Sequence, residues 1–218
     1  MLGITHAEPG DDQPIGGPHG ATLFHEPRYL SSWVMPNSLG IQDAYKQLTN
    51  ELSDRSARIK ACWEYVKNIP YVQFVRTHTN VGGKIFSQGD AWLDPAQSLQ
   101  VGRLNCLNKS TLLASLLRQD LSAEEIYVCL CNLTSDGVGG HAICYLASND
   151  LVMETTNPEL TNPFMRARDA DIYESVIFFN DQNMRYVPGV PYLSEPLGNC
   201  CVGWLRDYVN DRLCTEYV

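Results

Sequence analysis

A cysteine at the predicted start of an apolar helix is the position with the clearest chemical potential. The run Gly102–Ser110, Gly-Arg-Leu-Asn-Cys-Leu-Asn-Lys-Ser, places Cys106 directly before a leucine-rich segment, which predicts a helix from Cys106 to about Gln119. At a helix N-terminus, unpaired amides and the positive end of the macrodipole favour thiolate over thiol. The same amides can hold the oxyanion of a tetrahedral intermediate. Cys106 is therefore a candidate nucleophile; the alternative is a small buried side chain that begins a core helix.

Two further residues are of the types that a cysteine nucleophile needs. His141 follows Gly139-Gly140 and opens a predicted strand, His141–Ala147. Glu154 lies in the next predicted strand, Leu151–Thr156, where a carboxylate within an apolar run is costly unless it is paired. A histidine can serve as general base, and an acid can orient its imidazole. The alternatives are a structural histidine and an edge-strand acid that faces water.

The turn between these strands bears on whether the two side chains can meet. Asn149-Asp150 predicts a two-residue hairpin turn. In that register His141 and Glu154 are four residues out of opposition, an even number, so both project from the same face of the sheet. Four residues is too wide for direct contact. A hydrogen bond between them therefore needs a longer loop or a bulge.

Other periodic segments predict the elements that position these side chains. Helical spacing recurs in Ile41–Leu48 and in Ile59–Lys67, where Ser53 or Asp54 can cap the second helix and Pro70 ends it. Asn105 can cap the helix that begins at Cys106. The period then changes to two and predicts strands at 126–133, 141–147 and 151–156, with 175–179 and 184–187 as possible extensions of the sheet. Helices followed by strands predict an α+β fold.

Composition divides the chain into an arm and one domain. Residues 1–27 are rich in Gly, Pro, Asp and His and have no hydrophobic period, which predicts a flexible N-terminal arm. Residues 28–218 predict a single domain. Its core spans 53–158, and a C-terminal extension, 159–218, includes a possible helix at 201–213.

Charge and cysteine usage exclude several classes of protein. The 218 residues are 44% hydrophobic, enough to bury a core, and no run approaches the roughly 18 apolar residues of a membrane span. A net charge of -9 argues against nucleic-acid binding. The N-terminus lacks the features of a secretory signal. Eight cysteines without a Cys-x-x-Cys pair, and histidines without zinc-ligand spacing, predict reduced thiols in a cytoplasmic protein, with no metal site and no cofactor.

The order of these features resembles the transglutaminase-like, papain-related superfamily of cysteine proteases and acyltransferases. Trp63–Tyr71 is similar to the end of that family's first core helix, and Trp92-Leu93-Asp94-Pro95, with Leu99 and Gly102, is similar to its approach to the nucleophile. His141-Ala142 and Met153–Thr156 resemble its histidine and acid motifs. The resemblance covers about Ser53 to Pro158. It implies a papain-like core, with helices packed on an antiparallel sheet and the nucleophile at a helix N-terminus.

The resemblance also implies roles for individual residues, with some departures. Cys106 would be the nucleophile, His141 the general base and Glu154 the imidazole orienter. The family often has Gly-Asp-Cys-x-Asp, whereas Asn105 and Asn108 replace the two acids here. Glu154 stands where the family often has aspartate, and the aromatic residue expected after His-Ala is absent.

Three residues near Cys106 are candidates for the oxyanion hole or the cleft. Gln100 lies six residues before Cys106, the offset at which papain-like enzymes place an oxyanion glutamine. The alternative is an exposed loop glutamine. Trp92 is a candidate indole donor or cleft wall, and Asn105 is the third candidate.

The resulting expectation is acyl transfer by a Cys-His-Glu triad. Hydrolysis of a peptide or amide bond through an acyl-enzyme is the first choice, because water needs no second binding site. The substrate would be a peptide, a protein or an acyl thioester. One alternative is an amide-forming transglutaminase or acyltransferase that uses an amine acceptor. Another is a catalytically inactive, protein-binding scaffold of the same fold.

Overall fold

The computed structural model describes residues 28–72, 77–81, 84–88, 92–133, 139–167 and 173–187. The predicted N-terminal arm and the predicted helix at 201–213 lie outside these residues, as do Cys200, Cys201 and Cys214. The five described cysteines are free and buried: Cys62, Cys106, Cys129, Cys131 and Cys144. No helix in the described part of the chain is long and apolar enough to cross a bilayer.

Helices dominate the first half of the described chain and strands the second. The helices are α1 (Arg28–Ser31), α2 (Leu39–Thr49), α3 (Arg55–Asn68), α4 (Pro95–Val101) and α5 (Cys106–Leu117). The strands are β1 (Thr77–Val81), β2 (Lys84–Gln88), β3 (Ile126–Leu133), β4 (Gly139–Leu146), β5 (Leu151–Met153), β6 (Phe164–Arg166), β7 (Tyr173–Phe179) and β8 (Met184–Tyr186). The α+β class predicted from the sequence is confirmed.

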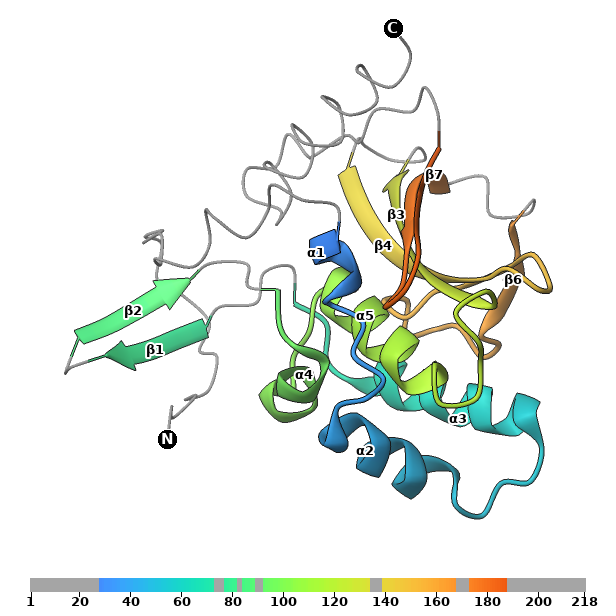
Figure 1. Ribbon diagram of the computed structural model, residues 1–218, viewed down its shortest axis with the longest axis horizontal. Helices are drawn as coiled ribbons and strands as arrows, with labels where there is room; N and C mark the ends of the chain where they lie inside the picture. The colour runs from blue at the N-terminus through green and yellow to red at the C-terminus, as the bar shows by residue number, and fades with distance from the viewer. Residues whose placement is uncertain are drawn as a thin grey trace, which may run out of the picture.

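An antiparallel sheet forms one layer of the domain. Its six described strands lie in the order β6-β5-β4-β3-β7-β8, with β3 and β4 at its centre. A β-bulge interrupts the pairing of β3 with β7 between Leu130 and Cys131. The strands β1 and β2 form a separate hairpin, which projects from the domain at the left of Figure 1.

Helix α5 is the central element of the core. It lies between the sheet and helices α2, α3 and α4 (Figure 1), and all twelve of its residues are buried. A helix surrounded in this way needs apolar side chains on more than one face. Four leucines supply them, and each is 0% exposed: Leu112, Leu113, Leu116 and Leu117. They pack in the same cluster as Ile126, Val128 and Leu130 of β3.

Local capping sets where the helices begin and end. The Asp54 side chain accepts from the Ala57 amide and starts α3, as the sequence predicts. Asp94 and Gln97 form a capping box at the start of α4. Gly102 ends α4 with a φ of 71°, a left-handed conformation that glycine adopts without steric cost. This turn directs the chain into the approach to Cys106.

The segment before Cys106 is also held by pairing with the end of α3. The Leu104 amide donates to the Pro70 carbonyl at 3.0 Å, and the Val72 amide donates to the Leu104 carbonyl at 3.1 Å. Together they form an isolated parallel bridge between Tyr71 and Leu104. The backbone two residues before Cys106 is therefore fixed to the segment that follows α3.

The register of β4 and β5 corrects the predicted hairpin. The loop has four residues, Ala147–Asp150, rather than the two predicted, because the strands pair Cys144 with Met153, Tyr145 with Val152 and Leu146 with Leu151. The longer loop shifts the register by two residues, so His141 and Glu154 are two rather than four residues out of opposition. At that diagonal offset, long side chains can touch.

Strand boundaries differ from the predictions at several other places. β4 begins at Gly139 rather than His141, and β5 ends at Met153 rather than Thr156. Strand β6 was not predicted. Glu154 is consequently the first residue after a strand, where the chain can bend its backbone toward side-chain partners.

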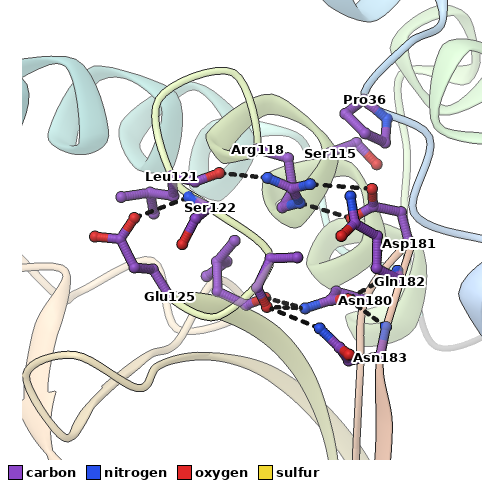
Figure 2. Close-up of polar contacts among 12 residues, drawn as sticks. Pro36, Ser115, Arg118, Leu121, Ser122, Glu125, Asn180, Asp181, Gln182 and Asn183 are labelled. Atoms are coloured by element: carbon purple, nitrogen blue, oxygen red, sulfur yellow. Dashed lines mark hydrogen bonds and ion pairs between the residues drawn. The ribbon is translucent and has the colours of Figure 1, made fainter.

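One buried asparagine ties the β7–β8 turn to the loop before β3 (Figure 2). Asn180 is 0% exposed, and its Nδ2 donates to the carbonyls of Ala123 at 2.6 Å and Ile126 at 2.9 Å. Its Oδ1 accepts from the amides of Gln182 and Asn183. Nearby, Arg118 at the end of α5 pairs with Asp181, so this end of α5 is tied to the same turn.

We expect Asn180→Ala to lower the free energy of unfolding by about 3 kcal/mol, because it leaves several buried backbone groups without a partner. Urea unfolding followed by circular dichroism measures this loss. Asn183→Ala is the matched control, since the Asn183 side chain makes only contacts of 3.4 and 3.5 Å and should cost less than about 1 kcal/mol. Equal losses in the two variants would contradict the role given to Asn180.

Candidate active site

Cys106 is the first residue of α5, and its neighbours order the beginning of that helix. The Asn105 side chain accepts from the Asn108 amide at 2.9 Å, which makes Asn105 the N-cap, as predicted. The first backbone bond of the helix runs from the Lys109 amide to the Asn105 carbonyl. The amides of Cys106 and Leu107 precede that bond. They lie at the positive end of the helix dipole, where anions are stabilised.

A second contact fixes the first turns of α5 against the strand that carries His141. Ser110, one turn after Cys106, donates its hydroxyl to the Ala142 carbonyl at 2.9 Å. Both residues are buried. The contact joins the residue next to His141 to the helix that begins with Cys106.

The structure brings Cys106, His141 and Glu154 together. His141 Nε2 lies 2.7 Å from Glu154 Oε2, and Cys106 interacts with the same imidazole, whose pKa it raises. Because Nε2 faces Glu154, Nδ1 is the ring nitrogen left for the sulfur. Their exposed fractions are 7% for Cys106, 8% for His141 and 4% for Glu154. The acid is thus the deepest of the three.

Four donors saturate the Glu154 carboxylate. Oε1 accepts from the Thr156 amide at 2.5 Å and from the Thr156 hydroxyl at 2.7 Å. Oε2 accepts from His141 and, at 2.8 Å, from the Tyr173 hydroxyl. Hydrogen bonds to a carboxylate favour its charged form, so this environment suits an anion.

The backbone that carries Glu154 is held from the helix side. Trp63 of α3 donates its indole N–H to the Glu154 carbonyl at 2.6 Å. Lys109 of α5 donates its ammonium to the Thr155 carbonyl at 3.0 Å and to the Lys67 carbonyl at 2.9 Å. Lys109 is 1% exposed, and burial lowers its pKa from 10.5 to about 8, while the Glu154 charge raises it. Two buried donors therefore fix the start of the acid's loop.

The pKa values of the histidine and the acid move apart. Burial alone lowers the pKa of His141, but its interactions with Cys106 and Glu154 raise that pKa from 6.5 to about 10. Burial alone raises the pKa of Glu154, but its hydrogen bonds with His141 and Thr156 and its attraction to His141 lower it from 4.5 to about 2. The pair is therefore an imidazolium and a carboxylate at neutral pH.

The three oxyanion or cleft candidates have different surroundings. Gln100 is exposed on α4, and none of the described residues is hydrogen-bonded to its side chain. Trp92 is partly buried and packs edge-on against Trp33, with ring centroids 5.4 Å apart. The amide of the next residue, Leu93, donates to Asn108 Oδ1 at 2.8 Å, which ties this segment to the first turn of α5. The Asn105 side-chain oxygen serves as the helix cap. The oxyanion roles remain predictions.

Four residues of this site were not predicted from the sequence: Trp63, Lys109, Thr156 and Tyr173. Trp63 and Lys109 donate to backbone carbonyls, which have no sequence signature. Tyr173 is nineteen positions from Glu154 and on a different strand, so no local spacing links them. Only Thr156 had a signal, since a threonine two residues after an acid can donate to it locally. In the described part of the chain, no group of three or more His, Cys, Asp or Glu residues could hold a metal ion.

Comparisons with known proteins bear on the fold. No protein-family model matches the chain, and no curated protein matches it. Among solved structures, EGTA-treated LapG from Legionella pneumophila aligns with this chain at a TM-score of 0.52 and 11% sequence identity. The alignment covers 79% of this chain and 88% of the LapG chain. A candidate cysteine protease from Cytophaga hutchinsonii aligns at a TM-score of 0.42 and 15% sequence identity. That alignment covers 72% of this chain and 52% of the Cytophaga hutchinsonii chain.

At such low identity the similarity to LapG is one of fold. It agrees with the arrangement already described, in which a cysteine begins a buried helix that packs on an antiparallel sheet. The chain therefore has the transglutaminase-like, papain-related fold.

Proposed function

We propose that this protein is a cysteine-dependent hydrolase that cleaves a peptide or amide bond through an acyl-enzyme on Cys106. One observation carries the proposal: His141 Nε2 lies 2.7 Å from Glu154 Oε2, and Cys106 interacts with the same imidazole and raises its pKa. A nucleophile, a base and a group that orients the base then follow one another in a chain of contacts. The position of Cys106 at the start of α5 supports the same assignment.

In the acylation step, Cys106 reacts as the thiolate of an ion pair with His141, which already holds the proton as an imidazolium. The sulfur attacks the substrate carbonyl carbon, and the electron pair of the C=O π bond moves to the oxygen. In this proposal the amides of Cys106 and Leu107, which precede the first backbone bond of α5, donate to the oxyanion. The intermediate then collapses, the C–N bond breaks, and the leaving amine takes the proton from His141.

In the second step, a water molecule replaces the amine. His141 accepts a proton from the water as its oxygen attacks the thioester carbonyl. Collapse of the second intermediate releases a carboxylic acid and restores the Cys106 thiolate beside the protonated His141. Glu154 stays ionised throughout, consistent with its lowered pKa, and stabilises the imidazolium in both steps.

We expect Cys106→Ala to reduce hydrolysis by more than about a thousandfold, because no other group supplies the covalent intermediate. The assay incubates the protein with a library of peptides whose amino termini are blocked and detects new amino termini by mass spectrometry. Cys62→Ala is the control, since Cys62 is a buried thiol on α3 that the reaction does not use. Unfolding curves verify that both variants are folded.

A labelled primary amine in the same incubation separates hydrolysis from amide formation. New termini without amine incorporation support the proposal. Attachment of the labelled amine to a substrate acyl group, with or without release of a new amino terminus, would assign an acyltransferase instead. If the native protein gives neither product, or if Cys106→Ala is as active as the native protein, the proposed hydrolase is wrong.

The His141–Glu154 pair predicts a window of pH in which it stabilises the fold most. The raised His141 pKa contributes stability fully below about pH 6.5, and this contribution is lost as the pH rises toward 10. The lowered Glu154 pKa contributes fully above about pH 4.5, and this contribution is lost as the pH falls toward 2. Both contributions are therefore complete between about pH 4.5 and 6.5.

We expect Glu154→Gln to lower the free energy of unfolding by about 3 kcal/mol within this window, and by less on either side of it. Urea unfolding of the native protein and the variant at pH values from 4 to 9 measures the difference. A loss that does not vary with pH would show that the two side chains do not form an ion pair.

A further inference from the structure

Tyr173 contacts both ionised members of the proposed triad. Its hydroxyl donates to Glu154 Oε2 at 2.8 Å, the same oxygen that faces His141. Its ring stacks on the His141 imidazole, with centroids 5.7 Å apart and an angle of 14° between the planes. One side chain on β7 therefore touches the acid with its polar end and the base with its aromatic face.

The surroundings keep the phenol in its donor form. Burial, the Glu154 charge and the hydrogen bond to Glu154 all raise the pKa of Tyr173 well above its ordinary value. The hydroxyl is therefore protonated at neutral pH. A carboxylate has no proton to give, so the bond runs from Tyr173 to Glu154.

The backbone explains how a residue on β7 reaches the site. Tyr173 lies opposite Leu133 of β3, and Ser175 lies opposite Cys131, which in turn lies opposite His141 of β4. Opposed residues of an antiparallel pair share a face, so Tyr173 and His141 project from the same face of the sheet.

We propose that Tyr173 is a positioning residue, resting on the proposed function, that holds Glu154 Oε2 and the imidazole plane in the geometry needed by the Cys106–His141 pair. The hydroxyl restricts rotation of the carboxylate about its last bond. The ring restricts rotation of the imidazole, because Glu154 contacts only one of its two nitrogens and leaves the ring plane free to turn. Without the hydroxyl, the carboxylate has three donors, protonates more easily and stabilises the imidazolium less.

Several other ionisable groups interact electrostatically with Glu154, and all of them are present in every variant of the test. They come from α5, β3 and β4, and all are buried: Lys109, Cys131 and Cys144. The Glu154 charge raises the pKa of each of them, behind the larger effect of burial. Substitution of Tyr173 leaves these side chains in place, so a change in the pH profile reports on the tyrosine.

The test measures the rate at which iodoacetamide alkylates Cys106, resolved by mass spectrometry, between pH 4 and 9. In the native protein we expect Cys106 to be alkylated faster than it is in His141→Ala. Tyr173→Phe keeps the ring and loses the hydroxyl. In this variant the pH at which the alkylation rate begins to increase should shift upward by about one unit, the typical effect of one hydrogen bond to a charged group. Tyr173→Leu, which loses ring and hydroxyl, should also lower the plateau rate by about tenfold or more.

Two reference variants fix the interpretation. Tyr145→Phe removes a similar tyrosine–carboxylate bond, to Asp150 at 3.0 Å, from the same sheet, and should leave the profile unchanged. His141→Ala gives the profile of Cys106 without its partner. Unfolding curves of each variant separate a lost contact from a lost fold.

The outcomes distinguish this inference from the proposed function. If native Cys106 alkylates no faster than it does in His141→Ala, the proposed hydrolase fails, and the role of Tyr173 fails with it. If the native profile shows the fast limb and Tyr173→Phe reproduces it unchanged, the role of Tyr173 alone is wrong. An unchanged Tyr173→Phe profile is decisive even if Tyr173→Leu does not fold.

Discussion

A carboxylate buried at 4% exposure is the constraint on which the rest of the site depends. An isolated charge in such a place would cost many kcal/mol, so Glu154 must be surrounded by donors or lose its charge. The fold supplies donors from three elements: Thr156 from the acid's own loop, His141 from β4 and Tyr173 from β7. The sheet order places β4 between β5 and β3, and β7 on the far side of β3, which brings these donors to one place.

The helices also hold the segment that carries the buried acid, through hydrogen bonds to its backbone. Trp63 and Lys109 hold the carbonyls of Glu154 and Thr155, and Lys109 belongs to the helix that begins with Cys106. Helix α5 thus contributes to the position of both the nucleophile and the acid. Because Lys109 is itself buried, removal of either partner leaves a charge or a carbonyl without its complement. Helix α5 therefore forms the centre of the core and also helps to position the residues of the proposed triad.

Much of the fold was predictable from the sequence, because local patterns of hydrophobic and capping residues specify its helices and strands. The strand at Ile126–Leu133 and the helix starting at Cys106 with Asn105 as its cap follow directly from periodicity and capping chemistry. The β4–β5 loop was not, since Asn149-Asp150 is a good turn signal whether it forms the whole loop or its second half. That difference of two residues decides whether His141 and Glu154 can touch.

The residues around the acid were harder to predict, for physical reasons. A lysine three positions after Cys106 looks like a solvent-facing charge, and only the tertiary fold provides the two carbonyls that make its burial possible. The tyrosine at 173 gives no local signal, because its partners lie on another part of the sheet. Gln100 was chosen from a spacing found in papain-like enzymes. It is exposed on α4, two residues before the turn at Gly102, and its oxyanion role stays a prediction.

The central claim is that Cys106 and His141 form an ion pair, and an NMR titration of the His141 imidazole tests it most directly. The native protein and Cys106→Ala would be compared, with the signal assigned from its absence in His141→Gln. The account predicts that the native imidazole keeps its proton well above its ordinary pKa of 6.5, and that this pKa falls when the sulfur is removed. A native His141 that titrates near 6.5, or a His141 pKa that is the same in Cys106→Ala as in the native protein, would contradict it.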